Sequence, residues 1–104
     1  MSNQNLTIDK LQEGDNITIS VNGAVTFSNA NTFRDALIPC FEENKHINID
    51  LAKVPSMSSG GIRVILKGYQ LSKSKGKTMT ILNVSESVMH TLTISGFANQ
   101  LTII

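Results

Sequence analysis

The sequence predicts an α/β fold with a mixed sheet of four to five strands and about three to four helices, in the order β-β-α-β-α-β-α-β. Several short segments alternate apolar and polar residues, which is typical of strands with one buried face. Segments with apolar residues at helical spacing lie between them. The 104 residues have room for one hydrophobic core, so we expect a single domain over residues 1–104.

The first two strands are predicted to form a hairpin. Leu6–Ile8 and Ile17–Val21 both alternate apolar with polar residues, and the polar stretch Glu13–Asn16 lies between them. An antiparallel pair at one edge of the sheet is therefore expected.

A helix is expected after Gly23, with Ser28 or Asn29 as its N-cap. Its apolar positions recur at helical spacing and are Ala30, Phe33, Leu37 and Phe41. Pro39 conflicts with a continuous helix, because an interior proline removes a backbone donor and costs roughly 3 kcal/mol. The sequence therefore predicts a kink or a break at Pro39.

The second helix is predicted from a change of period. Ile47–Leu51 alternates as a strand, and a loop runs from Pro55 to Gly61. From Ile62 onward the spacing is helical, and Gly76 is suited to the C-cap. The expected core face of this helix consists of Ile62, Ile65, Leu66 and Tyr69.

The remaining chain predicts a strand, a short helix and a final strand. Thr78–Leu82 is the strand, and Ser85 begins a helix that Gly96 ends. Leu101–Ile104 closes the chain as another strand. Strands that are separated by single helices usually pair in parallel through right-handed crossovers. The sheet is therefore expected to combine parallel pairs with one antiparallel edge pair.

Composition excludes several classes of function. A formal net charge of +1, with 40% hydrophobic and 16% charged residues, describes an ordinary soluble protein and argues against direct nucleic-acid binding. The polar N-terminus with Asp9 lacks the order of a secretory signal. Apolar runs stay far below the ~20 residues that span a bilayer. We expect a cytoplasmic protein without membrane insertion.

The chemistry-bearing residues do not form a catalytic or metal motif. Cys40 is the single cysteine, and its distances along the sequence from His46 and His90 do not match the spacing of a metal-binding motif. The carboxylates are scattered, and Ser58 lacks the Gly-x-Ser-x-Gly frame of a nucleophile elbow. No Walker lysine or dinucleotide-binding pattern is present. We therefore expect neither an enzyme nor a bound cofactor.

The most informative stretch is Ser56–Gly61, where a strand-exit loop becomes a helix. Ser58 is placed to cap that helix, and a phosphate on it would meet the positive end of the helix dipole. Gly60 and Gly61 weaken the helix, which suggests that a partner protein or a nucleotide phosphate approaches the backbone. The alternative is that these small residues only let the helix pack on the sheet.

Four segments together resemble the STAS domain family, and most closely its stand-alone bacterial anti-sigma-factor antagonists. They are Ile47–Leu51, Ser56–Ile62, Lys75–Lys77 and Ser95–Phe97, and the resemblance covers about residues 16–104. In that family the loop before the helix usually reads Asp-Ser-Ser/Thr-Gly. Ser58 matches its first serine.

The resemblance implies a partner-switching function. The unphosphorylated family member binds a serine kinase that is also the anti-sigma factor, phosphorylation of the serine blocks binding, and a PP2C-type phosphatase resets the cycle. Carried over to this chain, the phosphorylated residue is Ser58. The expected partner surface consists of Thr26, Met57, Ser58, Ser59, Gly60, Gly61, Arg63 and Lys67.

Two alternatives stay open at the level of sequence. Met57 stands where the family usually has an acid, and Ala24 and Thr26 stand where acids are common after the early glycine. One alternative is a constitutive adaptor subunit of a transporter or signalling assembly that is never phosphorylated. The other is a sensor that binds a nucleotide at the same helix terminus. Arg63 and Lys67 either contact an acidic partner or form a solvated helix face.

Overall fold

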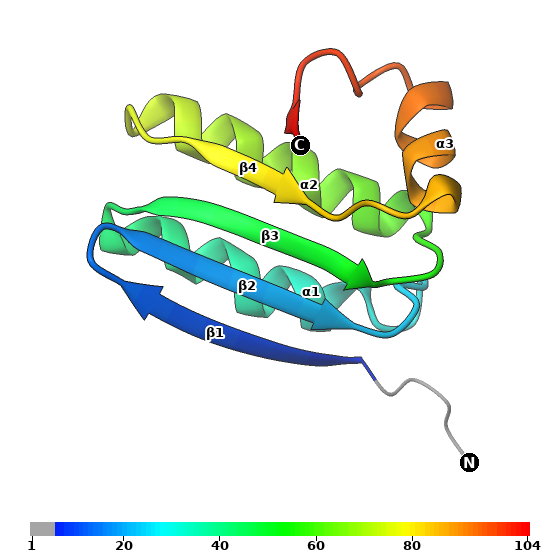
Figure 1. Cartoon of the computed structure of the whole chain (residues 1–104), viewed down its shortest axis with the longest axis horizontal. Coiled ribbons are helices and arrows are strands. Elements are labelled where there is room, and N and C mark those ends of the chain that lie inside the picture. Colours follow the sequence, from blue (N-terminus) through cyan, green and yellow to red (C-terminus); the bar gives the residue numbers. More distant parts are fainter. Residues whose placement is uncertain (1–5) are drawn as a thin grey trace.

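A mixed five-stranded sheet with the sequential order β1-β2-β3-β4-β5 organises the molecule (Figure 1). The computed structural model describes residues 6–104. Strand β1 pairs antiparallel with β2, and the other neighbours are parallel. The predicted α/β class and element order are confirmed. The elements are β1 Thr7–Glu13, β2 Asn16–Asn22, α1 Ala30–Leu37, the 3₁₀ helix η1 Ile38–Glu43, β3 His46–Lys53, α2 Ser59–Ser74, β4 Met79–Leu82, α3 Glu86–Ile94 and β5 Thr102–Ile103.

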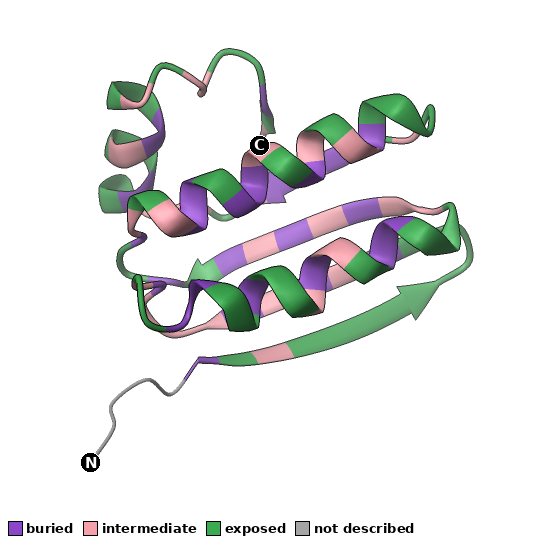
Figure 2. Cartoon of the chain, turned by 180° about the vertical axis from the view of Figure 1, so that it is seen from behind, coloured by how far each residue is buried: buried purple, intermediate pink, exposed green. Residues whose placement is uncertain are grey.

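Helices α1 and α2 cover the same face of the sheet, behind the strands in the view of Figure 1. The connections from β2 to β3 and from β3 to β4 both move across the sheet in the same direction. Because such connections are right-handed, they place α1 and α2 on the same face. Seen from that side in Figure 2, buried and half-buried residues alternate along β3. The core lies between these layers, and its largest fully buried side chains include Ile17, Ile19, Phe33, Leu37, Phe41, Ile47, Ile49, Ile65 and Ile81.

Strand β1 is longer than the sequence predicted. The expected strand ended at Ile8, whereas β1 continues to Glu13, which pairs with Asn16 across the turn. The β1 side chains are largely exposed, because this strand lies at the sheet edge and needs no buried stripe. Apolar alternation therefore could not reveal its second half. Gly14 supplies the left-handed φ of 59° that the predicted turn requires.

The predicted break at Pro39 is confirmed. Helix α1 ends at Leu37, and Pro39 lies in the first turn of η1, where its missing N–H removes no helical hydrogen bond. Phe41 belongs to η1 rather than to α1, but it is still buried against the core. The change of helix type thus preserves the apolar contact while accommodating the proline.

Helix α2 differs from the prediction in its buried face. It begins at Ser59, directly after the predicted N-cap Ser58, although the apolar helical spacing starts only at Ile62. Val64 and Gly68 are buried, whereas the expected core residues Leu66 and Tyr69 are only half-buried. A Cβ placed on Gly68 would lie 3.0 Å from the Met79 sulfur, so the glycine lets α2 approach β4 closely. The spacing of apolar residues does not identify such a glycine as a buried position.

The C-terminal third follows the sequence closely. Ser85 caps α3, and Val88 and Leu92 are fully buried, as the pattern indicates. Gly76, with a φ of 67°, follows the C-cap Lys75 of α2 in the left-handed conformation. The final strand is shorter than predicted and comprises only Thr102–Ile103.

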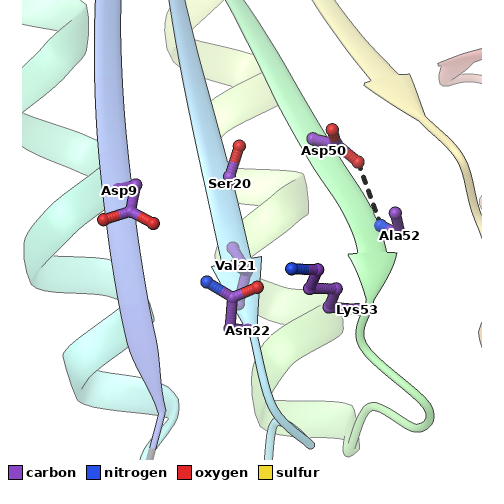
Figure 3. Close-up of a pocket in the computed structure, with 7 residues that line it drawn as sticks. All are labelled: Asp9, Ser20, Val21, Asn22, Asp50, Ala52 and Lys53. Carbon is purple, nitrogen blue, oxygen red and sulfur yellow. Dashed lines mark hydrogen bonds between the residues drawn. The ribbon is translucent and has the colours of Figure 1, made fainter.

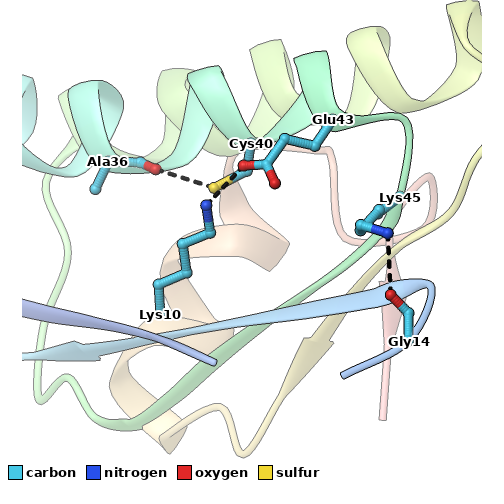
Figure 4. Close-up of polar contacts among 6 residues, drawn as sticks. All are labelled: Lys10, Gly14, Ala36, Cys40, Glu43 and Lys45. Atoms are coloured by element: carbon cyan, nitrogen blue, oxygen red, sulfur yellow. Dashed lines mark hydrogen bonds and ion pairs between the residues drawn. The ribbon is translucent and has the colours of Figure 1, made fainter. Parts of the chain in front are cut away.

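Polar contacts fasten the hairpin to the end of η1 (Figure 4). The Lys10 ammonium lies 2.6 Å from the Glu43 carboxylate, and Lys45 donates to the carbonyl of Gly14 in the turn. Beneath them, Cys40 is 3% exposed and its thiol donates to the Ala36 carbonyl at 3.3 Å. Burial raises the pKa of the Cys40 thiol. These features describe a structural cysteine.

Cys40 should therefore react slowly with thiol reagents in the folded protein, because burial disfavours the thiolate and blocks access to it. Labelling by 5,5′-dithiobis(2-nitrobenzoate) should be slow in native buffer and fast in denaturing urea, with a higher apparent pKa for the native reaction. Rapid native labelling at neutral pH would contradict the assigned packing of η1.

Candidate functional site

Three loops meet at the carboxyl ends of β2, β3 and β4, the edge of a parallel sheet where functional sites commonly lie. They are residues 23–29, 54–58 and 83–85. The N-termini of α1, α2 and α3 follow these loops directly. Each loop is held by specific hydrogen bonds rather than by chain connectivity alone.

The first two loops pair with each other. The Val25 amide donates to the Ser56 carbonyl at 3.0 Å, and the Ser58 amide donates to the Val25 carbonyl at 2.8 Å. Val25 and Met57 thereby form an isolated parallel bridge. This bridge extends the pairing of β2 and β3 beyond their ends and fixes the residue that begins α2.

Ser58 is the N-cap of α2, as the sequence predicts. Its backbone is extended, with φ −77° and ψ 169°, and its hydroxyl oxygen accepts from the Gly61 amide at 3.4 Å. Its carbonyl accepts the first helical bond from Ile62 at 3.1 Å. Ser58 is half-buried and Ser59 is exposed. The Ser58 hydroxyl thus lies at the positive end of the helix dipole.

The glycines are explained by packing within the chain. A Cβ on Gly61 would lie 2.5 Å from Met57 Cγ and 2.8 Å from Val25 Cγ1. A Cβ on Gly60 would lie 3.3 Å from the Ala30 side chain of α1. The groups that approach the helix backbone here are therefore side chains of this protein. No approaching partner protein or ligand is needed to account for Gly60 and Gly61.

Two residues of the expected partner surface are consequently unsuited to that role. Met57 is only 5% exposed, because the bridge to Val25 turns its side chain into the core. Gly61 is buried beneath it. The expectation that the apolar Met57 is offered to a partner is corrected: it supports the loop from below.

The loop before α1 is organised by Asn29, which is 4% exposed. Its side-chain oxygen accepts from the Thr26 amide at 2.7 Å, and its side-chain nitrogen donates to the Ala24 carbonyl at 3.0 Å. Asn29 is the N-cap of α1 by position, but its side chain holds the loop instead of capping a helical amide. The neighbouring Phe27 is left 75% exposed.

Ser85 joins the third loop to the Ser58 loop. Its hydroxyl accepts from the Val88 amide at 3.2 Å and donates to the Val54 carbonyl at 3.3 Å. One side chain therefore caps α3 and positions it against the segment that leads to Ser58.

Two surface grooves flank the N-terminal half of α2, one toward each neighbouring helix. The groove toward α1, here called the basic groove, is lined by Phe27, Ala30, Asn31, Arg34, Gly60, Arg63, Val64 and Lys67. The groove toward α3, here called the apolar groove, is lined by Ser59, Ile62, Arg63, Leu66, Thr91, Ile94, Ser95 and Phe97. Ser58 begins the helix that separates them.

The structure brings most of the expected surface residues together. Thr26 lies in the loop that pairs with the Ser58 loop, and Ser59, Gly60, Arg63 and Lys67 line the grooves. Phe27 and Arg34 were missed by the sequence reasoning. An aromatic residue between the polar Thr26 and Ser28 was the available signal for Phe27, whereas no sequence pattern distinguished Arg34 from other solvent-facing helix positions.

A further depression lies on the opposite face of the sheet and is lined mainly by polar residues of β1, β2 and β3 (Figure 3). Asp50 in it already accepts hydrogen bonds from the Ala52 amide and the Asn83 side chain. Within residues 6–104, no group of three or more His, Cys, Asp or Glu side chains is placed to hold a metal ion. Over the same residues, none of the helices combines the length and apolarity needed to traverse a bilayer.

Replacing Gly61 with Ala should lower the free energy of unfolding by about 1–3 kcal/mol, because the added methyl overlaps Met57 and Val25. Gly60→Ala is the matched control and should stay within ~1 kcal/mol of the wild type, since its closest contact is looser and Ala favours a helix. Urea unfolding measures both. Equal stability of Gly61→Ala and wild type would contradict the described packing.

Comparison with solved structures supports the fold. A crystal structure of an anti-sigma factor antagonist from Mycobacterium paratuberculosis superposes with a TM-score of 0.88 at 14% identity, covering 98% of this chain and 87% of that one. The Bacillus cell fate determinant SpoIIAA in its phosphorylated form superposes with a TM-score of 0.72 at 13% identity, covering 95% and 90% of the two chains. At these identities the likeness establishes the shared fold.

Comparison of sequences identifies the family. The anti-sigma-B factor antagonist of Bacillus subtilis (strain 168) is 25% identical over 99 residues, covering 95% of this chain and 91% of that protein. The family model described as STAS domain matches residues 7–104. The resemblance seen in the sequence is confirmed, and this chain belongs to the STAS domain family.

Proposed function

We propose that this protein is a partner-switching regulator of the anti-sigma-factor antagonist class. Unphosphorylated Ser58 and its surroundings bind a serine kinase that is also an anti-sigma factor, and phosphorylation of Ser58 releases that partner. A PP2C-type phosphatase restores the binding form. The protein performs no catalysis itself, and we place this cycle in the cytoplasm, with residues 1–104 acting as one domain.

The position of Ser58 carries this proposal. Its half-buried hydroxyl lies at the start of α2, beside the exposed Ser59 and between the two grooves. The relatives named as anti-sigma factor antagonists support the same class of function. Ser59 and Gly60, the two residues that follow Ser58, line the two grooves, so a partner seated there would lie close to this hydroxyl.

A phosphate at Ser58 would act by charge and by size. It adds about −1.5 to −2 charges, which changes the formal net charge from +1 to about −1. The helix dipole and the first-turn backbone amides of α2 favour this charge in the unbound protein. In a covered interface the same group would have to lose its hydration, which disfavours binding.

The direct test compares substitutions at Ser58 in binding and phosphorylation assays with a candidate serine kinase of the anti-sigma-factor class from the same organism. Ser58→Ala should keep binding and lose phosphorylation, and it should cost about 1 kcal/mol of stability because the cap is lost. Ser58→Asp should weaken binding at least tenfold while remaining stable, since Asp is also a good N-cap.

Ser59→Ala and Ser59→Asp are the matched controls, because Ser59 is exposed one residue away and accepts no capping bond. Intact-mass measurement should find one ATP-dependent phosphate in the wild type and both Ser59 variants. Tight binding of the kinase to both the phosphoprotein and the Ser58→Asp variant would contradict the proposal. Absence of phosphate under every condition, with binding retained, would favour the constitutive adaptor.

A further inference from the structure

The basic groove between α1 and α2 carries positive charge on both of its walls. Arg34 contributes from α1, and Arg63 and Lys67 contribute from α2, one helical turn apart. No carboxylate belongs to the residues that line the groove. An anionic group in this groove would meet cations from two elements at once.

The two α2 cations of this groove, Arg63 and Lys67, have neither an ion-pair nor a side-chain hydrogen-bond partner within residues 6–104. Arg34 lies 3.4 Å from Asp35, but both side chains are well exposed, at 54% and 72%. A surface pair of this kind is weak and leaves Arg34 able to turn toward another carboxylate.

The same groove has an apolar component at the end nearest Ser58. Phe27 is 75% exposed, and a Cβ on Gly60 would lie 3.8 Å from the Phe27 ring. Ala30 and Val64 form buried, apolar parts of the lining. Exposed aromatic side chains beside small residues are common anchors of protein interfaces.

We propose that the basic groove receives an acidic segment of the partner protein, with carboxylates against Arg34, Arg63 and Lys67 and an apolar side chain against Phe27. The proposal rests on the partner-switching function and specifies the chemistry of the partner at that site. The basic lining extends over two turns of α2, from Gly60 to Lys67, which is about 10 Å. A short helix or an extended segment of a few residues matches this length.

The test uses the same candidate kinase and charge-matched variants of one helix. Arg63→Gln combined with Lys67→Gln should weaken binding at least about tenfold at 50 mM NaCl and should reduce the dependence of affinity on salt. Lys73→Gln combined with Lys75→Gln removes the same charge from the other end of the helix, outside both grooves. This control should stay within about twofold of the wild type.

Carbodiimide cross-linking locates the contact, because it joins an amine to a carboxylate only when the two groups touch. Peptides that link Lys67 to an Asp or Glu of the kinase are expected. Replacing that carboxylate with Lys should restore binding to a Lys67→Glu variant. Cross-links confined to Lys73 and Lys75 would overturn the proposal.

The outcomes separate this inference from the function on which it rests. If no variant, including the wild type, binds the kinase, the partner-switching proposal fails and the acidic-segment proposal fails with it. If the kinase binds and phosphorylates Ser58 but ignores the Arg63 and Lys67 substitutions, only the acidic-segment proposal fails. Binding to vesicles of anionic lipid that depends on Arg63 and Lys67, with the kinase complex unaffected, would likewise reject a protein segment as the occupant.

Discussion

The short parallel pairing between Val25 and the segment Ser56–Ser58 determines how the backbone enters α2 at the edge where the three loops meet. It holds Ser58 in an extended conformation immediately before α2, so the hydroxyl is directed to the first turn of the helix. It also turns Met57 inward, and this requires a residue without a side chain at position 61. The half-buried Ser58 at the start of α2 and the buried Met57 are therefore two results of one backbone interaction.

The fold was predictable where the signal is local. The sequence correctly predicted the N-caps Ser58 and Ser85 and the helix break at Pro39. Each of these features depends on residues that are only a few positions apart. The full length of β1 was not predictable, since an edge strand needs no apolar alternation. The buried face of α2 was misjudged because Gly68 contributes to packing through its lack of a side chain.

The site was predictable only in part, for a different reason. Ser58 could be singled out from its position before a helix, but the orientation of Met57 depends on Val25, which lies 32 residues earlier in the chain. The exposure of Phe27 follows from the hydrogen bonds that the buried Asn29 makes within its loop. Pairings between distant loops leave no periodic pattern in the sequence. The type of a loop residue therefore does not show whether its side chain is exposed for contact or buried beneath the loop.

The two proposals together give the phosphate a second effect at this edge. Ser58 lies at the end of α2 from which the basic groove extends, and the groove carries cations on both walls. A phosphate on Ser58 would supply these cations with a negative charge from within the same molecule. It would then compete with the carboxylates of an acidic partner segment, in addition to repelling them directly. Release of the partner would thus depend on the charge of Ser58 at two places, the covered hydroxyl and the groove beside it, and neither effect requires the fold to change.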